Sequence, residues 1–458
     1  MPALRIVRSV LMSVLVLVPA SGVLAQGPSR PDADPRIQAL VARVSPQRLE
    51  EIVTKLVSFG TRSTLSDTLA TTRGIGAARR WIFDEFKRAS PKLQVSFDRH
   101  HVAQQGRITR DVDVVNVMAV LPGRSARRVY ISGHYDSVNP RDNAPQGRPA
   151  GAAGDVQSNR EFNHNVDAPG ANDDGSGTAL TMELARVFAE SGLTFDATLV
   201  FITWAGEEQG LIGSMAHAQR LAADKVVVEA NFNNDIVGNI HGGNGIIDGE
   251  SVRVYSLGPE DSMSRSLARY IARIGAIYVP SQTIRLMARE DRFGRGSDHS
   301  SFTANDFPAA VFREANENYF RQHSAEDKIE GVDFPYLAQN ARINAAGAAS
   351  VALAPPAPNV VSDRGQPRLS RGASGYDATM QWAASPGAVS YRLYWRNAWS
   401  NDWEHTQDVG AVTQFAFPNV SIDDYVFGVA AVGADGNQSL VSAYVSPVRR
   451  MSEIKLVP

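Results

Sequence analysis

Five short segments of the chain hold histidines, carboxylates or both in patterns that could bind metal ions. They are Gly-His-Tyr-Asp-Ser at 133–137, Gly-Ala-Asn-Asp-Asp-Gly-Ser-Gly at 170–177, Ala-Gly-Glu-Glu-Gln-Gly at 205–210, Asn-Asn-Asp at 233–235 and Gln-His-Ser-Ala-Glu-Asp at 322–327. Because the chain has no cysteine, a zinc ion would have to take imidazole and carboxylate ligands. Taken singly, a histidine or aspartate after a strand usually has a structural role, such as capping a helix. Metal chemistry therefore requires these segments to meet in space.

The predicted positions of the segments bring them together. Four of them follow directly on a predicted strand or the loop after it, and the fifth follows the strand at 309–312 after a longer loop. In an open α/β sheet the carboxyl ends of the strands line one crevice. Residues 198–204 are apolar throughout, so Glu207 and Glu208 leave a buried strand, where an uncompensated pair of carboxylates is costly. A cation bound beside them would remove that cost.

The elements that must position these segments alternate between strands and helices from residue 45 onward. Predicted strands lie at 94–97, 114–121, 128–132, 198–204, 226–232 and 309–312. Predicted helices lie at 46–57, 74–87, 177–190, 210–222 and 264–274, and helix returns after 334. This alternation predicts an α/β fold with a mixed, largely parallel sheet flanked by helices.

A second domain is predicted after a proline-rich linker at 354–358. Short strands separated by turn residues are expected at 379–382, 390–394, 414–417, 425–432 and 440–445. Their spacing predicts a small all-β sandwich over residues 359–458. Trp382 lies early in this part and Tyr425 lies at the position of a tyrosine corner, so the sandwich resembles a fibronectin type III domain.

The start of the chain, residues 1–25, is typical of a signal peptide for export. Two arginines precede an apolar run over 10–18 that is too short to span a bilayer, and Ala25 supplies the small residue before the expected cleavage. Residues 26–44 are polar and contain proline, so we expect a flexible N-terminal segment there. After removal of the signal, we expect a secreted or periplasmic protein without membrane insertion.

The composition gives no support for two classes of binding partner, nucleic acid and anionic membranes. The formal net charge is -2, charged residues make up 21% of the chain, and both signs are interspersed along it. A chain without a basic cluster gives no electrostatic support for nucleic acid or an anionic membrane as a partner. The lack of cysteine also excludes disulfides, so stability must come from the size of the core or from bound metal.

In their order along the chain, the five segments resemble the M28-type zinc peptidases, the family that includes bacterial leucyl-type aminopeptidases and glutamate carboxypeptidases. The resemblance extends to Asn-Val-Met-Ala-Val-Leu-Pro-Gly at 116–123 and to Ser-Asp-His at 297–299. It implies a zinc peptidase domain over residues 45–353.

The resemblance also implies a site with two zinc ions per chain. His134 and Asp235 would bind one zinc, Glu208 and His323 would bind the other, and Asp173 would bridge both. This ligand set agrees with the side chains that zinc prefers.

Two further catalytic residues are implied. Glu207 would be the general base that takes a proton from the water shared by the metals and passes it to the leaving amine. Asp136, two residues after His134, would accept a hydrogen bond from that imidazole and orient it. In the family the peptide bond after the bridging aspartate is often cis, which makes Asp173–Asp174 the candidate here.

The expected function is that of a secreted aminopeptidase acting on a peptide or protein substrate, and other functions stay open. A carboxypeptidase or dipeptidase of the same family would need basic residues for the substrate carboxylate, and Arg292, Arg295 and Arg313 could supply them. Glutaminyl cyclases resemble the chain too, but they use one zinc for acyl transfer and usually have tryptophan where Gln322 stands. A metal-stabilised binding protein is the third alternative, and it would not need Glu207 as a base.

Two other residues and one loop have open roles. His299 either approaches the substrate or makes a structural hydrogen bond. Tyr319 either stabilises an oxyanion or packs. The polar stretch at 138–167 separates two ligand segments, so we expect a surface loop at the mouth of the cleft and hypothesise a lid or specificity loop.

Overall fold

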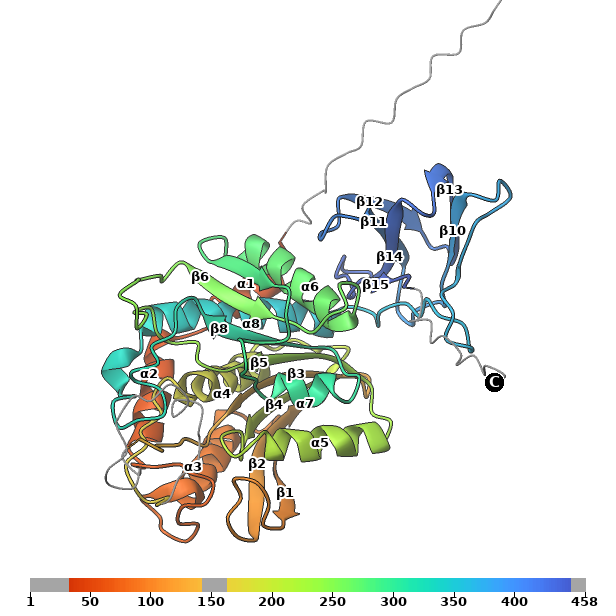
Figure 1. Ribbon diagram of the computed structural model, residues 1–458. Helices are drawn as coiled ribbons and strands as arrows, with labels where there is room; N and C mark the ends of the chain where they lie inside the picture. The colour runs from red at the N-terminus through yellow and green to blue at the C-terminus, as the bar shows by residue number, and fades with distance from the viewer. Residues whose placement is uncertain (1–32, 142–162, 446–458) are drawn as a thin grey trace, which may run out of the picture.

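The computed structural model describes residues 33–141 and 163–445. The predicted signal peptide (1–25) and the middle part of the insert at 138–167 lie outside these described residues. Along the chain, a large domain built on an eight-stranded sheet precedes a smaller domain of two antiparallel sheets (Figure 1).

The sheet of the large domain is mixed, with a parallel centre. Its strands are β1 (Gln94–Val102), β2 (Val112–Leu121), β3 (Arg128–His134), β4 (Thr198–Trp204), β5 (Val228–Asn234), β6 (Ser251–Tyr255), β7 (Thr283–Met287) and β8 (Ala309–Glu314). They lie in the order β1-β2-β4-β3-β5-β8-β6-β7. The central pairs β4–β3, β3–β5 and β5–β8 are parallel, whereas β1–β2, β2–β4 and β8–β6 are antiparallel. The predicted fold class is confirmed, and the carboxyl ends of the central strands meet at one edge.

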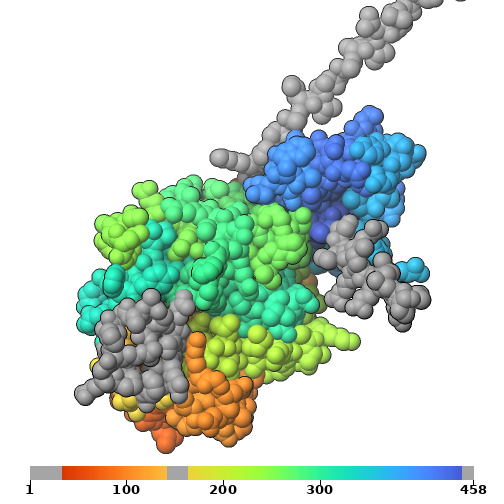
Figure 2. Space-filling view, in the orientation of Figure 1, coloured from red at the N-terminus to blue at the C-terminus, as the bar shows by residue number. Residues whose placement is uncertain are grey.

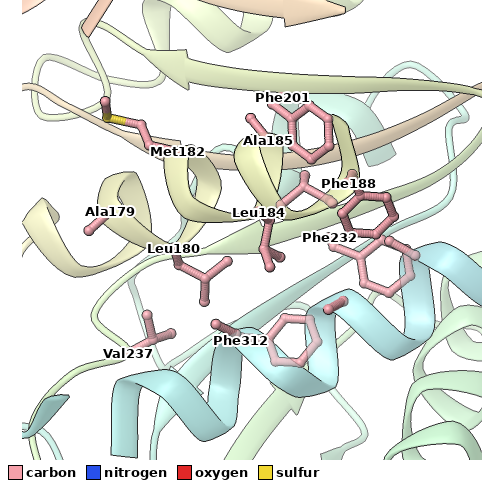
Figure 3. Packing of buried hydrophobic residues seen from close by; sticks show 14 of the residues in the cluster. Ala179, Leu180, Met182, Leu184, Ala185, Phe188, Phe201, Phe232, Val237 and Phe312 are labelled. Atoms are coloured by element: carbon pink, nitrogen blue, oxygen red, sulfur yellow. The ribbon is translucent and has the colours of Figure 1, made fainter. Parts of the chain in front are cut away.

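Helices cover both faces of this sheet. They are α1 (Pro35–Val41), α2 (Pro46–Val57), α3 (Gly74–Ala89), α4 (Gly175–Glu190), α5 (Ile212–Ala223), α6 (Met263–Tyr278), α7 (His299–Thr303) and α8 (Phe334–Leu353). Because side chains alternate along a strand, β4 serves both layers. Phe201 packs against Phe188 of α4 (Figure 3), whereas Trp204 packs on the other face against Phe302 of α7. Within the ranges described, none of the helices has the length and hydropathy that crossing a bilayer requires.

Most element bounds agree with the sequence-based prediction to within a few residues, but in the large domain the strands β6 and β7 and the helices α1 and α7 were not predicted. The strands β6 and β7 have five residues each and lie at the far edge of the sheet. Helix α1 lies inside the stretch 26–44, which we expected to be flexible. Ile37 and Leu40 of this helix are buried, since α1 packs against α8.

The C-terminal domain is the predicted all-β sandwich. Its strands are β9 (Leu369–Ser370), β10 (Asp377–Gln381), β11 (Ser390–Asn397), β12 (His405–Gly410), β13 (Gln414–Ser421), β14 (Tyr425–Val432) and β15 (Ser442–Ala443). They form the sheets β13-β10-β9 and β12-β11-β14-β15, of which β9 and β12 were not predicted. Met380 and Phe417 of the first sheet share a buried cluster with Leu393 and Phe427 of the second. The resemblance to fibronectin type III domains stays a prediction.

The two domains pack directly against each other along α6. Figure 2 shows the blue C-terminal domain against the green surface to which α6 belongs. Ser266 Oγ donates a hydrogen bond to the Val441 carbonyl oxygen (2.7 Å), and the Tyr270 hydroxyl donates to the Gln438 carbonyl oxygen (2.9 Å). Leu440 of the sandwich is buried within the hydrophobic core of the large domain.

Candidate metal centre

The carboxyl ends of three neighbouring strands position most of the predicted ligands. His134 is the last residue of β3, Asp235 directly follows β5, and Glu208 comes four residues after the end of β4. Asp173 comes two residues before the start of α4. Because β3 lies between β4 and β5, side chains from these three strand ends converge on one place.

Asp173 lies between the two predicted histidine ligands. Its Oδ1 is 3.3 Å from His134 Nε2, and its Oδ2 is 3.0 Å from His323 Nε2. His134 Nε2 also lies 3.7 Å from Asp235 Oδ1, and His323 Nε2 lies 3.3 Å from Glu208 Oε2. The fold thus gathers the other four predicted ligands around Asp173.

The side chains at this centre fit zinc. Both carboxylate oxygens of Glu208 and Nε2 of His134 are buried and make no hydrogen bond within the described parts of the chain. Burial and the charges of Asp173 and Glu207 raise the pKa of Glu208 well above its usual value. Leaving such a carboxylate ionised and unpaired costs several kcal/mol, and a bound cation removes that cost. A set of imidazoles and carboxylates is one that zinc commonly takes.

Asp136 supports both His134 and the loop that carries the two glutamates. His134 Nδ1 lies 3.1 Å from the carbonyl oxygen of Asp136 and 3.5 Å from its Oδ1, so the backbone is the closer partner. The Asp136 carboxylate accepts hydrogen bonds from the amides of Glu207 (3.3 Å) and Glu208 (3.2 Å) and from the Thr64 hydroxyl (3.0 Å). The sequence indicated Asp136 as the partner of His134, but it did not indicate the hydrogen bonds that Asp136 accepts from Glu207, Glu208 and Thr64.

Two carboxylates to which the sequence analysis gave no role hold Asp173 in place. Asp174 caps α4 and accepts hydrogen bonds from the amides of His134 (2.9 Å) and Gly177 (2.9 Å). Asp327 accepts one from the amide of Asp173 (2.9 Å). The peptide bond between Asp173 and Asp174 is cis, as the resemblance implied.

A buried arginine that the sequence analysis missed links two ligand segments. Arg62 is fully buried and donates hydrogen bonds to the carbonyl oxygens of Tyr135 (2.6 Å), Pro169 (2.6 Å) and Gly170 (2.8 Å). Burial lowers its pKa to about 10, which leaves it charged at neutral pH. Nothing in the polar sequence around this arginine distinguishes it from an exposed one, so no sequence signal could have found it.

Arg313 is not free to bind a substrate, although it was one of three arginines considered for that role. Its side chain is fully buried and contacts Asp235 Oδ1 (2.7 Å) and Asp291 Oδ2 (2.9 Å). It therefore supports a predicted metal ligand. Arg292 is also buried and pairs with Asp291 (3.1 Å).

His299 and Tyr319 lie outside the group of ligands. His299 is fully buried in α7, with Nε2 2.9 Å from the Glu290 carbonyl oxygen, which supports its structural role. Tyr319 is 42% exposed, and its ring lies beneath the Arg295 guanidinium at 5.2 Å. It does not line the pocket described next.

Four of the five predicted ligands line a pocket of about 210 Å³. It is lined by Arg107, Asp173, Glu207, Glu208, Gly210, Leu211, Asp235, Arg292, Gly294, Arg295, Gly296 and His323. A carboxylate oxygen of Glu207 lies within 4.8 Å of ligand atoms of His134 and Asp235. Burial raises the pKa of Glu207 well above its usual value, and the charges of Asp235 and Asp298 raise it further, against the lowering effect of His134.

Comparison with known proteins decides the family. The chain is 39% identical over 451 residues to a protein named "Probable zinc metalloprotease" from Pyricularia oryzae, an alignment that covers 89% of this chain and 84% of the relative. Residues 116–348 match the family described as Peptidase family M28. The chain belongs to this family. It is therefore a zinc metallopeptidase, a hydrolase of peptide bonds, and the predicted family is confirmed.

Solved structures confirm the fold of this M28 peptidase. The aminopeptidase LapA of Legionella pneumophila aligns with a TM-score of 0.52 at 21% identity, covering 70% of this chain and 75% of LapA. Glutaminyl cyclase of Porphyromonas gingivalis aligns with a TM-score of 0.50 at 15% identity, covering 67% and 98% of the two chains. At these identities the likeness concerns the fold alone, and the fold is common to both reactions.

Proposed function

We propose that this M28 peptidase is a secreted aminopeptidase that uses two zinc ions per chain to remove N-terminal residues from peptides or proteins. The observation that carries the proposal is the position of the Asp173 carboxylate, whose oxygens lie 3.3 Å and 3.0 Å from Nε2 of His134 and His323. A carboxylate held between two imidazoles suits a bridging ligand in a two-metal site.

The remaining ligands divide between the two sides of Asp173. We assign His134 and Asp235 to one zinc and Glu208 and His323 to the other, following the distances of 3.7 Å and 3.3 Å within these pairs. Bound zinc would polarise the scissile carbonyl and lower the pKa of the attacking water.

Glu207 is the residue we assign as general base. It lines the pocket, and its raised pKa brings the carboxyl closer to the working range of a proton carrier at neutral pH. Asp136 holds the Glu207 amide and so fixes the start of this side chain. In this role Glu207 takes a proton from the attacking water and gives it to the leaving amine.

The small pocket favours removal of a terminal residue. Its volume of about 210 Å³ is below the 300–1,000 Å³ common for ligand pockets, so it has room for the end of a chain. Of the carboxylates that line it, only Glu207 is not assigned to zinc, and this carboxylate would attract a free α-ammonium group.

Hydrolysis of leucine p-nitroanilide and of its N-acetylated form tests the proposal. The proposal predicts that zinc-loaded protein cleaves the free amine, that it leaves the acetylated compound intact, and that chelation abolishes cleavage. Equal cleavage of both compounds would rule out an aminopeptidase. Cyclisation of N-terminal glutamine without hydrolysis would instead identify a glutaminyl cyclase.

Export is the part of the proposal that rests on residues 1–25. The apolar run at 10–18 and Ala25 support cleavage after Ala25. N-terminal sequencing of protein recovered outside the cytoplasm should then begin at Gln26. Recovery of the intact chain in the cytoplasm alone would contradict it.

A further inference from the structure

The active-site pocket has a second, basic side. Besides the metal ligands and Glu207, three arginines line it: Arg107, Arg292 and Arg295. Arg107 comes from the turn between β1 and β2, and the other two come from the loop between β7 and α7. An aminopeptidase substrate brings an ammonium group to this pocket, and arginines do not attract a group of the same charge.

The arginines near the pocket outnumber the carboxylates that pair with them. Glu317 accepts ion pairs from Arg253 (2.9 Å), Arg292 (2.7 Å) and Arg295 (3.4 Å). Arg292 also pairs with Asp291. Arg295 has the longest of the three contacts with Glu317, and its side chain is 16% exposed.

Among the three arginines that line the pocket, Arg107 has the positive charge that is least neutralised by nearby carboxylates. Its Nη1 donates a hydrogen bond to the Glu208 carbonyl oxygen (2.9 Å), and no carboxylate of the described residues forms an ion pair with it. It therefore has guanidinium donors left over beside a residue that we assign to zinc. Guanidinium groups favour carboxylate partners because the two planar groups can form paired hydrogen bonds.

We infer that the substrate carries a carboxylate close to the scissile bond and that Arg295 and Arg107 bind it. The inference rests on the proposed function, since it names the substrate class of the same pocket. A pocket of about 210 Å³ is small, and successive residues of an extended chain are about 3.5 Å apart. The carboxylate therefore belongs to the residue next to the one that is removed, either as an acidic side chain or as the α-carboxylate of a dipeptide.

Four substrates with the same N-terminal residue separate these two sources. Leu-Gln-NH₂ carries neither carboxylate, Leu-Glu-NH₂ carries only the side-chain one, Leu-Gln carries only the α-carboxylate, and Leu-Glu carries both. The zinc-loaded enzyme should show a kcat/KM at least about tenfold higher for one singly charged substrate than for Leu-Gln-NH₂, the gain typical of a charge-assisted hydrogen bond. The better of the two singly charged substrates identifies the source.

Arg295→Met and Arg107→Met test the residues. Each should reduce the preference for the charged substrate to about twofold or less. The ratio between charged and neutral substrates is the readout, because a general folding defect lowers both rates and leaves their ratio in place. Arg289→Met is the matched control: this exposed arginine of the same loop lies over the Phe293 ring at 5.9 Å and does not line the pocket, so the preference should persist.

The outcomes separate the inference from the function on which it rests. A preference that disappears in the Arg295 or Arg107 variant and persists in the Arg289 variant supports the inference. Hydrolysis of all four dipeptides at similar rates, or a preference that neither variant changes, overturns the inference and leaves the aminopeptidase in place. If the enzyme hydrolyses none of the four compounds and does not hydrolyse leucine p-nitroanilide, both the proposed function and the inference are overturned.

Discussion

Glu207 and Glu208 are neighbours in the chain, yet the proposed function gives them different roles. Both amides donate to the carboxylate of Asp136, which fixes the backbone of the pair. The Glu208 oxygens lie buried beside His323 and make no hydrogen bond within the described parts of the chain, as expected of a ligand. Glu207 lies on the side of His134 and Asp235. In the proposed function, the end of one strand would thus supply both a zinc ligand and a general base.

Substitution of these two glutamates should separate the roles. Glu207→Gln removes the proton acceptor but keeps the size of the side chain, so kcat should fall about a thousandfold while the zinc content is unchanged. Glu208→Gln should lower both the activity and the zinc content, because an amide is a weaker zinc ligand than a carboxylate. Elemental analysis and steady-state kinetics on the same preparations provide the check. Loss of zinc from the Glu207 variant would show that this residue is a ligand.

The predicted metal ligands and the partner of His134 could be predicted from the sequence, whereas most of the residues that hold their backbone could not. His134, Asp173 and Glu208 belong to recognisable segments at strand ends. Arg62 and Asp327 act through hydrogen bonds to backbone groups of distant segments. Asp327 belongs to the segment at 322–327, but nothing local in the sequence indicated this contact, and Arg62 lies in no such segment.

At the scale of elements, a buried charged cluster fastens α5 to the β1–β2 edge of the sheet. Asp98 of β1 is 4% exposed and contacts His217 Nδ1 (2.8 Å) and Arg220 Nη2 (2.7 Å) of α5. It also contacts His100 Nε2 (3.0 Å) and accepts a hydrogen bond from Asn116 of β2 (3.0 Å). Burial alone would raise the pKa of Asp98, but the hydrogen bonds from His100 and His217 hold it well below its usual value. The ionised carboxylate therefore stabilises the fold.

Asp98→Asn should destabilise the protein in a pH-dependent way. A carboxyl group whose pKa is lowered by folding contributes its full stability above its unfolded pKa of about 4, and that contribution is lost as the pH falls further. We expect the free energy of unfolding to drop by about 3 kcal/mol at pH 7 and the difference from wild type to shrink below about pH 4. Urea denaturation at several pH values measures both.

The exposed pair of His101 and Asp113 in the same two strands provides the control. These side chains are 72% and 58% exposed, so Asp113→Asn should leave stability unchanged within error. A constant cost of Asp98→Asn from pH 7 down to pH 3 would contradict the assignment of an ionised Asp98.

The elements that the sequence analysis missed are short or depend on neighbours. Strand β7 pairs only with β6 among the described strands and keeps no fully buried side chain, so its sequence has little apolar pattern. Helix α1 has seven residues, and its burial against α8 is a long-range contact that local periodicity cannot reveal. The strand at 198–204 could be predicted with its bounds because both of its faces are buried.

At the scale of the whole molecule, the sandwich packs directly against the large domain and is not joined to it by the linker alone. Arg396 of β11 pairs with Asp261 just before α6 (2.6 Å), and Arg269 of α6 donates to the Asn401 carbonyl oxygen (2.8 Å). These contacts and the burial of Leu440 in the other domain's core join the two cores across α6. The sequence predicted the linker at 354–358, but nothing in its proline-rich composition indicated how tightly the domains pack.

Calorimetry should therefore show one unfolding transition for the two domains. Removal of zinc should lower the midpoint of the whole transition by about 5–10 °C, because ligand bound to the folded large domain stabilises everything that unfolds with it. Two separate transitions, one of which keeps the same midpoint after chelation, would show that the sandwich unfolds independently of the large domain.

The number of zinc ions per chain, measured by elemental analysis together with the activity at each level of loading, tests the central claim most directly. We expect about two zinc ions per chain, cleavage of leucine p-nitroanilide that is lost on chelation, and recovery of that activity when zinc is restored. One zinc ion per chain at full activity, or N-terminal glutamine cyclisation in place of hydrolysis, would contradict a two-zinc aminopeptidase centred on Asp173.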